Sequence, residues 1–151
     1  MIRKIGFLFA LSIGLQAKGQ EHDVRQVITD LFSSMYNADA SGLKKVFHDS
    51  ARLGSVAVDA SGNPVVKYAD ISGFINYVGK LEKGVADERF TITDIRIDGK
   101  MASAWVPYHF YRAGSFSHCG VNHMLLTRGK DGWKILTITD TRRKDDCPPI
   151  R

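Results

Sequence analysis

Three long β-strands are predicted in residues 101–142, MASAWVPYHFYRAGSFSHCGVNHMLLTRGKDGWKILTITDTR. The strands cover residues 101–111, 116–128 and 133–142, because extended, apolar-rich segments are separated there by turn-forming residues such as Asp131-Gly132. Asp98-Gly99, just upstream, is a further hairpin turn that joins an earlier strand to this set. Long neighbouring strands with short turns predict an antiparallel sheet.

Amphipathic helices precede the sheet. Over Asp23–Asn37 the apolar side chains recur at helical spacing, which predicts a helix with one buried stripe. A short helix follows Ser41, a hairpin is predicted over Arg52–Tyr68, and Asp70 caps a third helix. The strand near Phe90 changes its alternation, which predicts a bulge at Thr93 or Asp94. Helices on one side of an antiparallel sheet make the fold class α+β, in one domain.

The N-terminus has the pattern of a secretory signal peptide. Arg3 and Lys4 precede the apolar run 5–15, and Ala17-Lys18-Gly19 is a small-x-small cleavage site. The run is shorter than the roughly 20 residues that a membrane-spanning helix needs. We therefore expect a signal peptide at 1–19, a domain at 20–142 and a C-terminal tail at 143–151, in a periplasmic or secreted bacterial protein with no membrane span after cleavage.

The net charge does not indicate a nucleic-acid partner. The 151 residues include 21 Lys and Arg and 16 Asp and Glu, a net charge of +5. Three of the basic residues belong to the expected leader, whose removal leaves 18 basic and 16 acidic residues. The basic run 142–144 is followed at once by Asp145 and Asp146. A nearly balanced, exported chain is not expected to bind nucleic acid.

Two cysteines, Cys119 and Cys147, remain after cleavage, and two interpretations stay open. In an oxidising compartment they can form a disulfide that pins the tail to the domain. Alternatively both are free thiols, because the sequence does not fix the separation of their Cα atoms. Metal-ligand spacings such as HxxxH and CxxC, the phosphate-binding loop and the dinucleotide-binding glycine motif are all absent from the sequence, so no metal and no cofactor is expected.

The element order, together with residues 32–53 (FSSMYNADASGLKKVFHDSARL) and the segment 131–135 (DGWKI), resembles the nuclear transport factor 2-like superfamily. The segments 117–120 (SHCG) and 141–143 (TRR) are similar to those of its exported bacterial "putative lumazine-binding" group. The resemblance implies a cone, in which a curved antiparallel sheet wraps around a long N-terminal helix and leaves a pocket at its open end. The superfamily includes ketosteroid isomerase-like and polyketide cyclase-like proteins as well as binding modules, so the fold does not determine the function.

The resemblance also orients the strands. Trp133 and Ile135 are core positions in the family's last strand, and strict alternation from them places Thr137 and Thr139 inward and Asp140 outward. With Asp94 at the bulge, this count leaves no carboxylate inside the pocket, and His118 is the candidate general base. The expected pocket residues are Tyr36, Tyr108, Phe110, His118, Asn122, Met124, Thr137 and Thr139.

Three functions fit this reading. The first is an exported protein that binds a small apolar or aromatic ligand in the pocket. The second is a ketosteroid isomerase- or cyclase-like enzyme with His118 as base, and the third is a non-catalytic dimeric interaction domain. Strand 101–111 is apolar on both faces, so the face away from the helices is expected to form a homodimer interface. Its predicted members are Trp105, Tyr111, Leu136 and Ile138.

Overall fold

The computed structural model describes the backbone of residues 6–150 and the side chains of residues 18–150. Three helices are present: α1 (Gly6–Tyr36), α2 (Ala40–Val46) and α3 (Ile71–Val78). The Asp39 carboxylate accepts hydrogen bonds from the first backbone N–H groups of α2, and Asp70 caps α3 in the same way. In the part of the chain that the structure describes, no helix is both long and apolar enough to cross a membrane.

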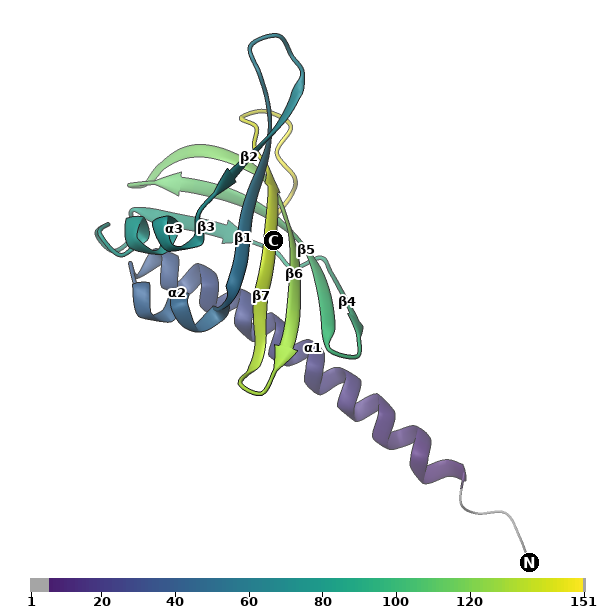
Figure 1. The fold of residues 1–151 in the computed structure, drawn as a ribbon. Helices are drawn as coiled ribbons and strands as arrows, with labels where there is room; N and C mark the ends of the chain where they lie inside the picture. The colour runs from purple at the N-terminus through teal and green to yellow at the C-terminus, as the bar shows by residue number, and fades with distance from the viewer. Residues whose placement is uncertain (1–5, 151) are drawn as a thin grey trace, which may run out of the picture.

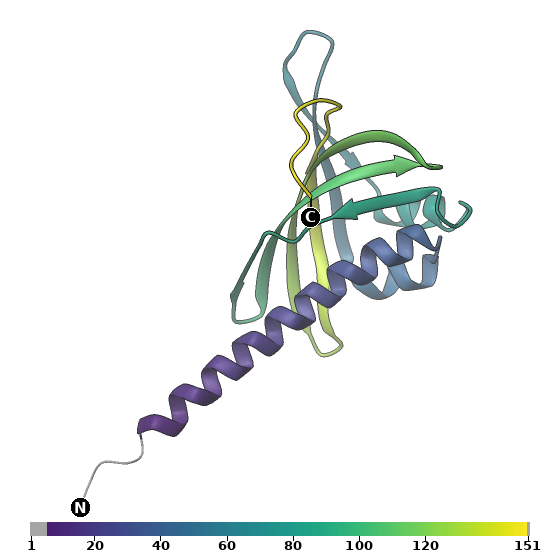
Figure 2. The ribbon, with the colours of Figure 1, turned by 180° about the vertical axis from the view of Figure 1, so that it is seen from behind.

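Helix α1 crosses the concave face of the sheet and its N-terminal part extends beyond the sheet (Figures 1 and 2). Burial of its described side chains begins at Val24 and recurs at Ile28 and Leu31, as the helical periodicity predicts. Residues 6–19 of the expected signal peptide continue the same helix, and residues 1–5 lie outside the described residues. Cleavage after residue 19 therefore stays a prediction.

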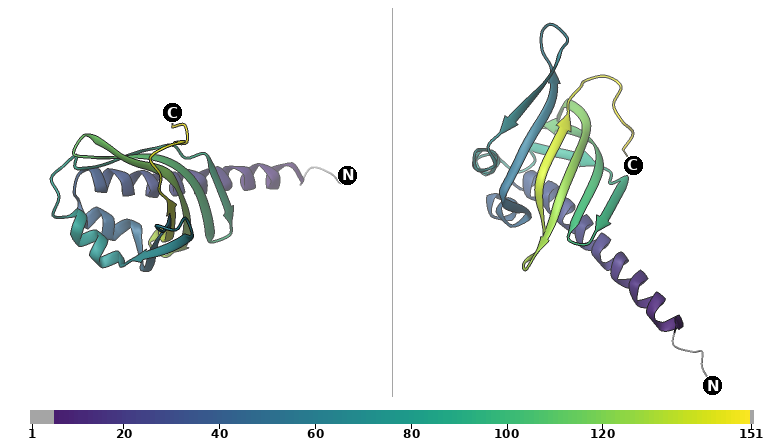
Figure 3. Two further views of the ribbon diagram at one scale, coloured as in Figure 1. Left: turned by 90° about the horizontal axis from the view of Figure 1, so that it is seen from above. Right: turned by 45° about the vertical axis from the view of Figure 1, so that its right-hand side comes forward.

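A curved sheet wraps around α1, while α2 and α3 lie at one end of it (Figure 3). The strand order is β2-β1-β7-β6-β5-β3, and β4 pairs with the other half of the same edge of β5. The fold class is thus α+β with an open cone, as predicted. The strands are β1 (Phe47–Val58), β2 (Pro64–Ala69), β3 (Ala86–Phe90), β4 (Asp94–Asp98), β5 (Met101–Arg112), β6 (Ser115–Gly129) and β7 (Gly132–Thr141).

One strand pair departs from the antiparallel pattern. Strands β1 and β7 are parallel, with Leu53 opposite Ile138, so the sheet is mixed. The hairpin turns that fix antiparallel pairing elsewhere do not join these two strands, which are separated in sequence by α3 and five other strands. The core lies between α1 and the concave face, where the small residues Ala102 and Ala104 of β5 are almost completely buried.

A β-bulge in β7 reverses the predicted orientation of the strand's second half. Leu125 pairs with Thr137 but Leu126 pairs with Ile135, so Leu136 is an extra residue in β7. An extra residue moves every later side chain to the opposite face. Ile138 and Asp140 consequently point into the cone, and Thr139 is exposed on the outer face.

Beyond β7 the chain continues antiparallel beside β6, where Cys119 pairs with Arg143, and its backbone passes very close to Gly120. The Tyr108 hydroxyl donates a hydrogen bond to the Thr141 carbonyl oxygen (2.9 Å), and Cys119 and Arg143 exchange two backbone hydrogen bonds (2.8 and 2.9 Å). A Cβ atom at Gly120 would overlap the Thr141 carbonyl oxygen, so only glycine permits this approach. We call residues 141–147 the C-terminal crossing.

The C-terminal crossing is also covalently fixed. The structure joins Cys119 and Cys147 by a disulfide, with their Cα atoms 5.6 Å apart. The His109 Nε2 atom hydrogen-bonds the Pro148 carbonyl oxygen (2.9 Å). Cys119 and His109 face away from α1, so the tail returns along the outer face of the sheet (Figure 3, right). The segment that bears Arg142 is therefore anchored on both sides.

Candidate functional site

Two adjoining cavities open on the concave side of the sheet, between α1, α3, β1 and the ends of β6 and β7. The smaller has a volume of about 130 Å³ and the larger about 400 Å³. Both are bordered by the same five side chains, so these stand between the two spaces and face both. The shared residues are Met35, Phe74, Glu88, Asp140 and Arg142.

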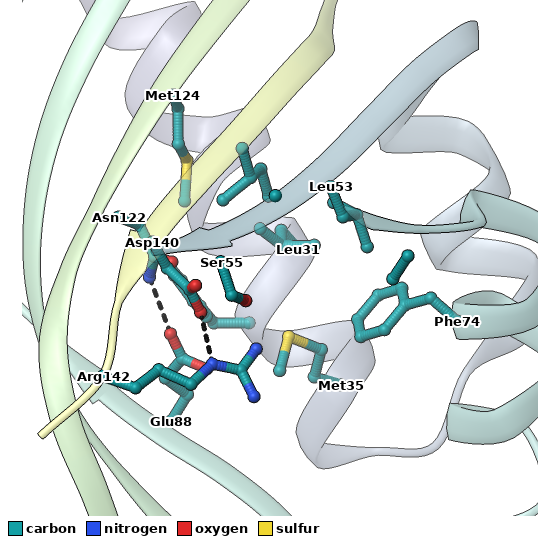
Figure 4. Close-up of a pocket in the computed structure, with 14 residues that line it drawn as sticks. Leu31, Met35, Leu53, Ser55, Phe74, Glu88, Asn122, Met124, Asp140 and Arg142 are labelled. Carbon is teal, nitrogen blue, oxygen red and sulfur yellow. Dashed lines mark hydrogen bonds and ion pairs between the residues drawn. The ribbon is translucent and has the colours of Figure 1, made fainter. Parts of the chain in front are cut away.

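Most of the surrounding wall is apolar. Leu31 of α1, Leu53 of β1 and Ile138 of β7 border the smaller cavity, and Met124 lies on its β6 side (Figure 4). The larger cavity is bordered by Tyr77, Val78, Leu81, Val85 and Phe110, together with Arg112, Ser117 and His118. An apolar wall with a few polar groups on one side is the usual form of a small-molecule site.

Glu88 is the first polar group of the site. It lies on β3, and its Oε1 atom accepts a hydrogen bond from Asn122 Nδ2 on β6 (2.7 Å; Figure 4). Burial raises the pKa of the Glu88 carboxyl from its ordinary 4.5 to about 7. The hydrogen bond from Asn122 and the charge of Arg142 oppose this rise in pKa, and the negative charge of Asp140 adds to it. Glu88 can therefore hold or release a proton near neutral pH.

Asp140 and Arg142 form an ion pair at the end of β7. Arg142 Nε donates to Asp140 Oδ2 (2.9 Å), and the Asp140 side chain is only 11% exposed, whereas that of Arg142 is 53% exposed. The other carboxylate oxygen, Asp140 Oδ1, is buried without a hydrogen-bond partner among the described residues. Arg142 thus stands at the solvent side of the site and Asp140 inside it.

His118 lies at the edge of the larger cavity. Its Nδ1 atom is hydrogen-bonded with Ser117 Oγ (3.1 Å), and its ring lies beside those of Phe110 and Tyr108, with centroids 5.1 and 5.7 Å away. Burial, reinforced by the charge of Arg142, lowers the pKa of His118 below 6.5, and the charge of Asp140 opposes this. The imidazole is therefore mainly uncharged at pH 7.

Comparison with known proteins identifies the family. Residues 19–139 match the family model described as "Putative lumazine-binding". The chain belongs to this family. A comparison with curated protein sequences finds no match.

Solved structures similar to this lumazine-binding-family member share its fold. A nuclear transport factor 2-like protein of unknown function from Shewanella baltica has a TM-score of 0.67 at 15% identity, over 84% of this chain and 96% of that one. One with a cystatin-like fold from Novosphingobium aromaticivorans has a TM-score of 0.70 at 13% identity, over 95% and 94%. A third, from Cytophaga hutchinsonii, has a TM-score of 0.63 at 16% identity, over 82% and 98%. These matches show that the chain has the fold of nuclear transport factor 2-like proteins.

Half of the pocket residues expected from the sequence border the cavities. Asn122 and Met124 line the smaller cavity, and Phe110 and His118 line the larger one. Tyr108 lies elsewhere: it is almost completely buried and holds the C-terminal crossing through its hydroxyl group.

The other three expected residues do not border either cavity. Tyr36 is 41% exposed and lies beside Lys83, whose Nζ atom is 5.9 Å from the ring centroid. Strict alternation along β7 predicts that Thr137 and Thr139 face inward, which is wrong beyond the bulge at Leu136. The same alternation predicts that Ile138 and Asp140 face outward, whereas both border the smaller cavity.

Sequence reasoning missed the three charged groups of this family member's site. Ala86, Glu88 and Phe90 share one face of β3, and Phe90 packs on Phe32 of α1 with the ring centroids 4.2 Å apart. Extending the alternation back from Phe90 would have placed Glu88 inside the cone. No local signal locates Arg142, because its position depends on how the C-terminal crossing pairs with β6. Among residues with described side chains, no group of three potential ligands could hold a metal ion.

Proposed function

We propose that this protein binds a small molecule in the two adjoining cavities, with an apolar body against the wall and a polar group at Glu88, Asp140 and Arg142. The observation that carries the proposal is the open apolar space with its polar groups gathered on one side. A structural domain filled by its own side chains would not keep this space. Membership of the lumazine-binding family supports a small-molecule ligand.

Filling the smaller cavity tests this proposal. Ile138→Phe adds a ring to the cavity wall, whereas Thr139→Phe adds the same ring to the neighbouring residue on the outer face. We expect the fluorescent probe 1-anilinonaphthalene-8-sulfonate to bind the Ile138→Phe variant at least about tenfold more weakly than the wild type, as measured by titration. The Thr139→Phe variant should match the wild type. Equal probe affinity in both variants would contradict binding in this cavity.

A second candidate function is proton transfer in the same cavity, as in an isomerase- or cyclase-like enzyme. A carboxyl group with a pKa of about 7 is suited to general acid–base catalysis near neutral pH. Glu88 is therefore a stronger candidate for the base than His118, which lies at the edge of the larger cavity. The two functions differ in one respect: the enzyme requires a ligand whose reacting proton lies within reach of Glu88.

We also propose that the protein is exported and acts in the periplasm or outside the cell. The leader pattern of residues 1–19 supports export, and the Cys119–Cys147 disulfide supports an oxidising compartment.

We also propose that the protein forms a homodimer through the outer face of the sheet, with fewer interface residues than the sequence predicts. Trp105 is 50% exposed on the outer face, where its ring lies 6.0 Å from that of His123. Tyr111 and Leu136 stay candidates, and Ile138 is excluded because it faces the cavity. We expect light scattering to give twice the chain mass for the wild type and a single chain mass for Trp105→Glu. A single chain mass for the wild type would contradict the dimer.

A further inference from the structure

We propose that the polar group recognised by this site is a carboxylate, so that the ligand is a small apolar carboxylic acid whose head group sits between Arg142 and Glu88. This inference rests on the proposed function and names the class of ligand for the same site.

Arg142 is arranged to bind an anion. Its Nε atom is committed to Asp140, but the two terminal Nη groups have no hydrogen-bond acceptor among the described residues. Figure 4 shows the guanidinium group directed toward the cavity, on the side of Met35. A guanidinium group held at Nε presents two parallel N–H donors, the arrangement that pairs with both oxygens of a carboxylate. Asp140 and the C-terminal crossing fix this orientation before a ligand arrives.

Glu88 provides the second contact in its protonated form. Asp140 and Arg142 neutralise each other, so an additional anion is tolerated only if Glu88 is uncharged. A protonated carboxyl can also donate its O–H to a carboxylate oxygen. Asn122 Nδ2 donates a hydrogen bond to Oε1 of Glu88, so Oε2 remains to contact the ligand.

The other ionisable groups around Glu88 do not add negative charge near neutral pH. From β5, burial raises the pKa of Tyr108 well above its usual range, so this phenol stays protonated. From β6, His118 is mainly uncharged, and Arg112 of β5 also borders the larger cavity. Helix α3 contributes the phenol of Tyr77, and α1 contributes only apolar side chains. When Glu88 holds its proton, the charges of Asp140 and Arg142 therefore cancel, and the exposed Arg112 adds a positive charge at the border of the larger cavity.

The larger cavity can take the apolar body of such an acid. Its volume of about 400 Å³ lies within the range of about 300–1,000 Å³ that is typical of small-molecule sites. Arg142 and Glu88 border both cavities, so a head group at this point can accompany a chain or ring against Val78, Leu81 and Phe110. The arrangement selects a ligand with one anionic end and an uncharged body.

Binding should be coupled to a proton. Because the carboxylate binds the protonated form of Glu88, its affinity should fall as the pH rises through the Glu88 pKa of about 7. Well above that pH the loss should approach tenfold per pH unit. A neutral ligand of the same shape should show a much smaller dependence on pH.

The test compares octanoate with octanamide by isothermal titration calorimetry at pH 6.0 and pH 8.5. In the wild type we expect octanoate to bind at least about tenfold more tightly than octanamide at pH 6.0. The ratio of the two affinities should be at least about tenfold smaller at pH 8.5. Arg142→Gln should bind both ligands alike. The matched control is Arg143→Gln, which changes the neighbouring side chain. Arg143 Nε donates a hydrogen bond to the Asp146 carbonyl oxygen. This variant should still bind octanoate more tightly than octanamide at pH 6.0.

Glu88→Gln separates the proton from the rest of the site. The glutamine amide can donate an N–H in place of the carboxyl O–H and cannot ionise, so octanoate binding should persist with a flat pH profile. Equal wild-type affinity for octanoate and octanamide would overturn the carboxylate inference and leave the binding function standing. If neither ligand binds and Ile138→Phe leaves the fluorescent probe unaffected, the proposed function fails as well.

Discussion

Gly120→Ala is expected to lower the free energy of unfolding by about 2–4 kcal/mol, because the added Cβ atom would overlap the Thr141 carbonyl oxygen. The C-terminal crossing would have to move away from β6. That movement would break the hydrogen bond from the Tyr108 hydroxyl group and the backbone pairing of Cys119 with Arg143. Each of these bonds contributes on the order of 1 kcal/mol. Urea denaturation followed by circular dichroism measures the loss.

Gly129→Ala is the matched control for this variant. Gly129 is the last residue of the same strand, and a Cβ atom there meets nothing within 4 Å. Its stability should therefore stay within about 0.5 kcal/mol of the wild type. Because the crossing carries Arg142, Gly120→Ala should also weaken the binding of octanoate. Equal stability of the two alanine variants would show that the crossing does not depend on the close approach at Gly120.

Glu88→Gln is expected to make the protein more stable than the wild type at pH 8.5 by about 3 kcal/mol. The folded-state pKa of Glu88, about 7, lies above its ordinary value of 4.5, so the folded chain holds the proton more tightly than the unfolded chain does. The wild type therefore loses stability as the pH rises from about 4.5 to about 7, and the loss is complete above that range. The difference between a pKa of 4.5 and one of about 7 corresponds to about 3 kcal/mol, and glutamine, which cannot ionise, avoids this cost.

The same measurement at pH 4 provides the internal control. Both carboxyl and amide are then uncharged, so the wild type and Glu88→Gln should have nearly the same free energy of unfolding. Glu82→Gln removes an exposed carboxylate from the turn after α3 and should change stability little at either pH. A stability difference between Glu88→Gln and the wild type that does not grow between pH 4 and pH 8.5 would contradict a buried, proton-binding Glu88.

The elements that could be predicted from the sequence are those with a strong local period. The buried stripe of α1, the Asp70 cap of α3 and the hairpins of β5, β6 and β7 all follow from residues close together in the chain. The start of α2 was not predicted correctly, because the sequence suggests a helix after Ser41 whereas Asp39 caps it. The sequence predicts one strand with a bulge at Thr93 or Asp94, whereas residues 91–93 separate two strands, β3 and β4. The stripe, the Asp70 cap and the hairpins agree with the structure because neighbouring residues determine them.

The errors in the site arose where one local irregularity has distant consequences. The extra residue Leu136 leaves β7 recognisable as a strand but reverses the face of Ile138, Thr139 and Asp140. The parallel pairing of β1 with β7 joins segments about 85 residues apart, and no turn sequence indicates it. Arg142 borders the cavity where the chain passes close to Gly120 of β6 and is anchored beyond it by a disulfide.

The central claim, that a small molecule binds beneath Arg142, can be tested most directly with the methionine methyl groups. Met35 borders both cavities, whereas Met101 is 53% exposed at the start of β5 and borders neither. In a protein labelled with ¹³C at methionine methyl groups, titration with octanoate at pH 6.0 should shift the Met35 resonance saturably and leave that of Met101 in place. An unchanged Met35 resonance at saturating octanoate, or a shift confined to Met101, would contradict the claim.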